Sequence, residues 1–193
     1  MSNVRGVLEP SLRQFERPIL VYLESARTES KTDKDNIETT TLKDERVALS
    51  AKLFTAVKTN ADEMTQGHPY WKFFEGPARP RFMVFSSQGE LIGKIEGNVS
   101  PTKLSDLMKR ALHDEFAFSF DRWVKDYQKV LTGIDKLEGL KKALDQKAER
   151  DTSTSAKREI AERREKLETE STALVNEEKK LLDLKRKDAV AKN

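Results

Sequence analysis

The chain has 193 residues, enough for one ordinary domain plus an extension. Its 36 Lys and Arg residues against 33 Asp and Glu residues leave a formal charge of +3, which is too small to indicate nucleic-acid binding by itself. The chain contains no cysteine, and this excludes disulfides, thiol catalysis and cysteine-ligated metal.

The N-terminal part of the chain predicts helices alternating with strands. A short amphipathic helix is expected over Val7–Phe15, and an apolar strand follows over Pro18–Glu24. Asp33 or Asp35 is expected to cap the next helix. The apolar positions between residues 42 and 54 then read as helix.

The middle of the chain predicts three further strands, and the last two of them are joined in a hairpin. A second strand is expected over Phe54–Thr59, followed by an irregular segment. Two apolar runs, Phe82–Phe85 and Leu91–Ile95, flank Ser-Gln-Gly and predict a β-hairpin. Ser100 as N-cap and Pro101 at the first helical position predict the start of another helix.

That last helix need not stop, because apolar residues continue at alternating spacings of four and three. Such a stripe over more than four heptads predicts a long coiled-coil helix. Gly133 and Gly139 weaken it by about 1 kcal/mol each and allow a local bend. The stripe consists of Phe116, Phe120, Trp123, Tyr127, Val130, Ile134, Leu137, Leu144 and Ala148, with Lys141 in the one missing place.

A break at residues 151–155, Asp-Thr-Ser-Thr-Ser, separates this helix from a second one that is expected to run to about Lys187. Leucine or isoleucine recurs every seventh residue in the second helix, but the intermediate positions Arg164, Ser171 and Glu178 are polar. The two helices therefore fold back as an antiparallel hairpin, or a single straight helix pairs with another chain. In a hairpin, the large aromatic residues would stay partly uncovered.

The order of these elements resembles the thioredoxin fold. "SLRQFERPILVYLESA" is similar to the first helix and strand of bacterial thioredoxin-like proteins. "TLKDERVALSAKLFTAVKTNADE" resembles the next helix and strand, and "GPARPRFMVFSSQGELIGKIEGNVSPTKLSDLMKRAL" the cis-proline loop, hairpin and last helix. The resemblance implies an α/β, thioredoxin-like domain over residues 1–115, and the heptad stripe predicts a helical coiled-coil extension over residues 116–193.

The family's Cys-x-x-Cys pair has no counterpart here. Counting back from Leu42 matches the pair to Lys31 and Lys34, and counting forward from Tyr22 matches it to Thr28 and Lys31. Both registers lack the thiolate that dithiol–disulfide exchange requires. We therefore expect no dithiol oxidoreductase activity, no catalytic residue, no cofactor and no metal.

The resemblance also implies that Pro80 is the family's cis-proline and that the backbone before it pairs with an extended client peptide. Lys31, Lys34, Arg79 and Arg81 can form a basic rim there that favours an acidic peptide or an anion. The alternative is a solvated loop whose acidic residues cancel the field.

Two functions remain open at this stage. The first is a redox-inactive protein-binding or scaffolding module that acts through the proline loop or through the helical arm, where Trp123 and Tyr127 can contact a protein partner or a second copy. The second is a non-cysteine enzyme of the glutathione-using or peroxide-handling type, with a hydroxyl at Thr28, Ser30 or Thr32. The near balance of charges argues against nucleic acid. No apolar run spans a membrane, and we expect a soluble protein, cytoplasmic or periplasmic.

Overall fold

The computed structural model describes residues 17–24, 31–63, 80–97, 99–151, 153–185 and 187. The chain divides into two compact units, residues 1–120 with 186–193 and residues 121–185. We call the first the sheet unit and the second the helical hairpin. The helix expected over Val7–Phe15 lies outside the described residues.

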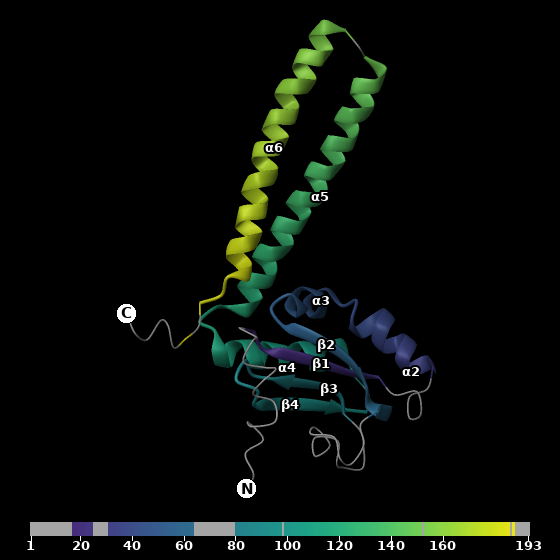
Figure 1. Ribbon diagram of the computed structural model, residues 1–193, viewed down its shortest axis with the longest axis vertical. Coiled ribbons are helices and arrows are strands. Elements are labelled where there is room, and N and C mark those ends of the chain that lie inside the picture. The colour runs from purple at the N-terminus through teal and green to yellow at the C-terminus, as the bar shows by residue number, and fades with distance from the viewer. Residues whose placement is uncertain are drawn as a thin grey trace. The chain divides into compact units, whose positions relative to one another are not determined.

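The described residues of the sheet unit form a four-stranded mixed sheet in the order β2-β1-β3-β4 (Figure 1). Its strands are β1 (Ile19–Glu24), β2 (Thr55–Asn60), β3 (Pro80–Phe85) and β4 (Leu91–Glu96). β1 runs parallel to β2 and antiparallel to β3, and β3 runs antiparallel to β4. Each strand begins and ends within two residues of its predicted bounds.

Between β1 and β2, the described residues from 31 onward form three short helical pieces where the sequence predicts longer helices. They are α2 (Lys31–Asn36), the π-helical turn η1 (Ile37–Thr41) and α3 (Glu45–Ala51). In η1 the Leu42 amide donates to the carbonyl of Ile37 over 2.9 Å, the long step that widens the helix. The turn is anchored where the buried Thr41 hydroxyl donates to the Val99 carbonyl.

The predicted helix cap in this segment is wrong. Asp33 and Asp35 lie inside α2 and do not precede it. Asp44 is the residue that caps, since its side chain accepts hydrogen bonds from the Arg46 and Val47 amides at the start of α3. An Asp is a good cap in any of these places, and the turn of η1 decides which one begins a helix.

α4 (Pro101–Glu115) begins as predicted and packs on the sheet. The Ser100 hydroxyl accepts from the Lys103 amide over 3.3 Å, and Pro101 occupies the first turn. A Cβ at Gly93 would lie 2.8 Å from Leu107 Cδ1, so the bare glycine lets α4 close on β4.

Apolar residues of β1, β3, α3 and α4 form the core of the sheet unit. The rings of Tyr22 and Phe82 stack at 4.9 Å between neighbouring strands. β2 lies at one edge, where it ends in the 3₁₀ turn η2 (Ala61–Glu63). The least exposed core residues include Leu23, Val47, Phe82, Val84, Leu104, Met108 and Leu112.

Two long helices form the helical hairpin, α5 (Phe120–Arg150) and α6 (Thr154–Leu182), and they run side by side in opposite directions (Figure 1). The predicted break is confirmed, because Ser153 caps α6 through the Ala156 amide. The expectation of a helix continuous from residue 101 onward is wrong: α4 ends at Glu115, and Phe116 turns to extended backbone. No described helix is long and apolar enough to cross a bilayer.

Candidate functional site

Two charged residues mark the carboxyl ends of the parallel strands β1 and β2. Glu24 ends β1, and Lys58 lies next to Tyr22 in the register of β2. Lys58 Nζ lies 3.0 Å from Glu24 Oε2 and 5.5 Å from the centroid of the Tyr22 ring. In sheets with parallel strands this edge is where ligands and catalytic groups commonly lie, which makes it the first place to look for a site.

Helix α2 and turn η1 each supply one further charged residue. The four side chains together form what we call the Glu24 cluster. Lys34 of α2 donates to Glu24 Oε1. Lys58 also contacts Glu38 of η1, with 3.3 Å between Nζ and Oε1. The Glu24 cluster thus holds two carboxylates and two ammonium groups, and its formal charges cancel.

The pKa values of this cluster move in the direction of a fully charged network. The hydrogen bond from Lys34, followed by that from Lys58, holds the pKa of Glu24 below its usual value. The hydrogen bond to Glu24 raises the pKa of Lys34 and is also the largest cause of the raised pKa of Lys58. A carboxylate with a lowered pKa is a weak general base near neutral pH, and the paired lysines are weak proton donors there. The arrangement favours an ion-paired scaffold over proton transfer.

Of the residues predicted for the lost thiol position, two lie in the described part of the chain. Lys31 is exposed at the start of α2, and Lys34 belongs to the Glu24 cluster. Thr28 lies outside the described residues. Since Glu24 balances Lys34, that lysine adds little net charge to a basic rim.

The predicted proline loop is described only from its last residues onward. Arg79 lies outside the described residues, and with it the predicted cis bond to Pro80. Pro80 begins β3 opposite Glu96, and Arg81 follows half-buried at an irregular step of the β3–β4 register. The structure therefore brings Arg81 onto the sheet, and the client-peptide function of the loop stays a prediction.

Trp123 and Tyr127 close the hairpin where α5 begins and α6 ends. Their ring centroids lie 5.1 Å apart, the Trp123 indole donates to the Leu181 carbonyl over 2.7 Å, and the Tyr127 hydroxyl donates to Glu178. The expectation that these aromatics stay partly uncovered is wrong, since they are 4% and 0% exposed. Glu178, a polar residue at the seam, accepts a hydrogen bond from the tyrosine hydroxyl and so closes the hairpin there.

Sequence reasoning missed Glu24, Glu38 and Lys58. The available signal was their place: Glu24 and Lys58 each lie near the end of a predicted strand, and the structure pairs these two strands in parallel, so the same end of the sheet holds both. Within the residues that the structure describes, no three histidine, aspartate or glutamate side chains gather in a way that would hold a metal ion.

No protein-family model matches this chain, and no curated protein matches it either.

Proposed function

We propose that this protein is a redox-inactive, thioredoxin-like domain joined to a helical hairpin, and that it acts as a protein-binding or scaffolding module. The strand order β2-β1-β3-β4, with a parallel first pair and antiparallel β3 and β4, supports the thioredoxin-like assignment. The covering helix α4 after the β3–β4 hairpin agrees with it as well.

The observation that carries the redox-inactive part of the proposal is the Glu24 cluster. In thioredoxin-like enzymes a thiolate pair follows the first strand, at the start of the next helix. Here that region has no cysteine, and its Lys34 is held by Glu24 in an ion pair. What such a domain retains is its surface, and a long hairpin adds further surface for contact with another protein.

One assay tests the redox part of the proposal. Purified protein is mixed with insulin and dithiothreitol, and the turbidity of reduced insulin is followed against a thioredoxin control. We expect the rate of the uncatalysed mixture. Sustained turnover above that rate would overturn the proposal, and saturable glutathione binding would favour the alternative, an enzyme with a non-cysteine residue at the helix start.

A second experiment tests the binding part. The full chain is immobilised, incubated with the cell extract of its source, and cross-linked, and the cross-linked positions are mapped by mass spectrometry. We expect reproducible cross-links to one or a few proteins. They should come from the hairpin or from the end of the sheet where β3 begins at Pro80. If no protein is retained above an unrelated cysteine-free control of similar charge, the binding role fails.

A further inference from the structure

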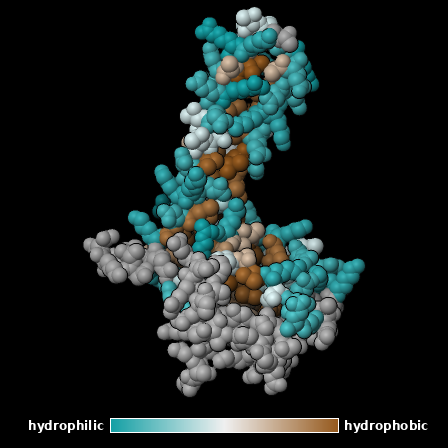
Figure 2. Space-filling view, in the orientation of Figure 1, coloured by the Kyte–Doolittle hydropathy of each residue, from teal (hydrophilic) through white to brown (hydrophobic). Residues whose placement is uncertain are grey.

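We propose that a groove on one side of the helical hairpin binds an amphipathic helix of a partner protein whose apolar stripe is flanked by acidic residues. This inference rests on the proposed binding function and names the partner's chemistry. The groove has an apolar floor, made by Leu140, Ala143 and Leu144 of α5 and Leu167 of α6. Figure 2 shows brown apolar surface interrupting the teal hydrophilic surface along the hairpin.

The two sides of the hairpin seam differ. On one side, Arg164 pairs with Asp145 over 2.7 Å, and Lys141 pairs with Glu168 over 3.4 Å. Lys141 and Asp145 are four residues apart, so these two pairs cover the same side of α5. Ion pairs therefore bridge the two helices along this side.

The other side of the seam is bridged at one end, where Lys147 pairs with Glu159, and stays open beside Leu140. Leu140, Ala143 and Lys147 follow one another at spacings of three and four, and they lie on the opposite flank of α5 from the bridging pairs. Leu140 is 45% exposed, although Leu144 beside it is only 6% exposed. On α6, Leu167 packs against the buried cluster that contains Leu144, and it leaves Leu140 exposed.

The margins of the groove are mainly basic. Lys147, Arg163 and Lys166 line it together with a single acid, Glu170. Outside the groove, Glu159 lies 2.8 Å from Lys147 and 3.1 Å from Arg163, and it balances part of their charge. Counting Glu159, three cations still face two carboxylates, so the formal charges around the groove leave an excess of one positive charge.

This charge pattern selects the occupant. A second copy docked symmetrically would bring Lys147, Arg163 and Lys166 of both chains toward one another, and such like-charge contacts disfavour the pair. A partner with Asp and Glu on both sides of an apolar stripe gains attraction at the same margins. The stretch of α5 that lines the groove, from Leu140 to Lys147, is about 10 Å long at 1.5 Å per residue. This length matches two turns of a docked helix.

The test uses the full chain and two synthetic amphipathic peptides of 18 residues. Both carry leucines at helical spacings of three and four; one has Glu and the other Lys at the flanking positions. Fluorescence anisotropy measures binding. We expect the Glu peptide to bind, the Lys peptide to bind roughly tenfold more weakly, and the affinity for the Glu peptide to fall as salt rises.

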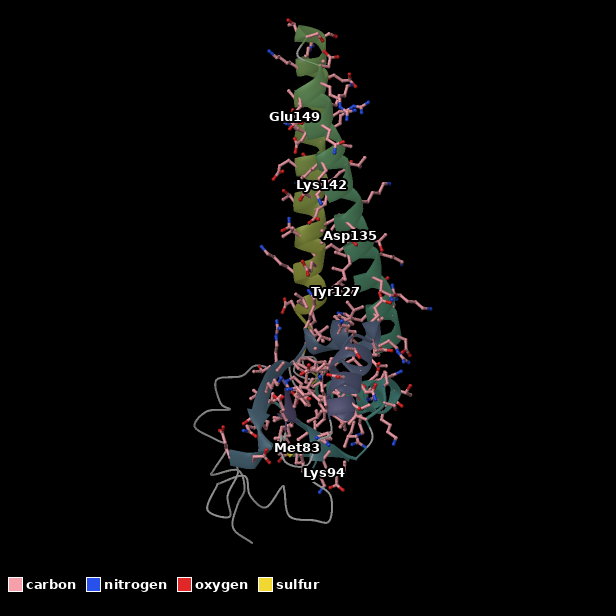
Figure 3. All side chains as sticks on the ribbon, turned by 90° about the vertical axis from the view of Figure 1, so that its right-hand side faces the viewer. Met83, Lys94, Tyr127, Asp135, Lys142 and Glu149 are labelled. Atoms are coloured by element: carbon pink, nitrogen blue, oxygen red, sulfur yellow. The ribbon has the colours of Figure 1, made fainter. Side chains whose placement is uncertain are left out.

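Matched variants locate the site. Leu140→Ser should weaken the Glu peptide roughly tenfold. Val175→Ser, which changes an α6 residue of similar exposure, 41%, outside the groove, should leave binding unchanged. Lys166→Glu should weaken the Glu peptide and strengthen the Lys peptide, whereas Lys142→Glu, on an exposed part of α5 (Figure 3), should do neither. Circular dichroism checks that each variant stays helical.

Three outcomes overturn the groove proposal: no binding of the Glu peptide, equal loss for Leu140→Ser and Val175→Ser, or self-association in sedimentation that Leu140→Ser abolishes. The first two leave the wider binding role standing if cross-links to a partner are found elsewhere on the chain. Absence of any cross-linked partner, with the Glu peptide still bound, removes the wider role and leaves the groove as a peptide site.

Discussion

Gly133 and Gly139 lie in the same long helix, and replacing each with alanine should give different results. An alanine in a helix interior is favoured over glycine by about 1 kcal/mol, so both changes carry the same intrinsic gain. At Gly139 a Cβ would meet no atom within 4 Å. At Gly133 it would lie 2.9 Å from Leu174 Cδ1 and 3.2 Å from Leu174 Cδ2.

The contact at Gly133 should cancel the gain. Carbon atoms pack at about 3.5–4.0 Å, so Leu174 must rotate away from its present position. An off-rotamer side chain costs about 0.5–1.5 kcal/mol, which is as much as the helix gains. We expect Gly139→Ala to raise the free energy of unfolding by about 1 kcal/mol and Gly133→Ala to change it little. In a Leu174→Ala background, Gly133→Ala should show its full gain.

Urea unfolding followed by the fluorescence of Trp123, in a Trp71→Phe background, measures these differences within the hairpin. Trp123 reports on the hairpin because its indole donates a hydrogen bond to the Leu181 carbonyl of the opposite helix. Equal stabilisation by Gly133→Ala and Gly139→Ala would refute the close approach of Leu174. The same conclusion would follow if the Leu174→Ala background made no difference to Gly133→Ala.

Two further predictions concern polar contacts. Tyr127→Phe should lower the free energy of unfolding of the hairpin by about 2 kcal/mol, because it removes a buried donor to a carboxylate; an unchanged urea midpoint would contradict this. The pKa of Glu24 is lower in the folded chain than its usual value of 4.5, so the stability that its ion pairs give is present above about pH 4.5 and is lost as the pH falls through the lowered pKa. Glu24→Gln should therefore lose less stability than the native chain in urea titrations between about pH 5 and pH 2, and parallel losses would count against the cluster.

Local signals in the sequence predict the elements well. Ser100 followed by Pro101 identifies the start of α4 because capping depends on residues that are neighbours in the chain. The break near Ser153 follows from the same chemistry. In contrast, Asp44 as the cap of α3 depends on the π-helical turn before it, which no local pattern indicated.

Contacts between distant residues explain what the sequence could not predict. In the sequence, Glu178 interrupts the hydrophobic seam. In the structure it accepts a hydrogen bond from the hydroxyl of Tyr127, 51 residues away. The Glu24 cluster likewise joins residues from a strand, a helix, a turn and a second strand. Leu140 is an apolar residue next to Lys141, the one polar position of the stripe. The heptad spacing does not include Leu140, so the pattern did not identify it.

The hydrogen bond between the Trp123 indole and the Leu181 carbonyl bears on how this chain can change in evolution. It holds the first turn of α5 beside the last turn of α6, so the chain enters and leaves the hairpin at neighbouring points. A segment whose ends meet can be inserted into a loop, lengthened by whole heptads or removed without stretching the rest of the chain. If the hairpin binds a partner as proposed, its specificity can therefore change by exchange of this one segment, while the sheet that precedes it keeps its sequence.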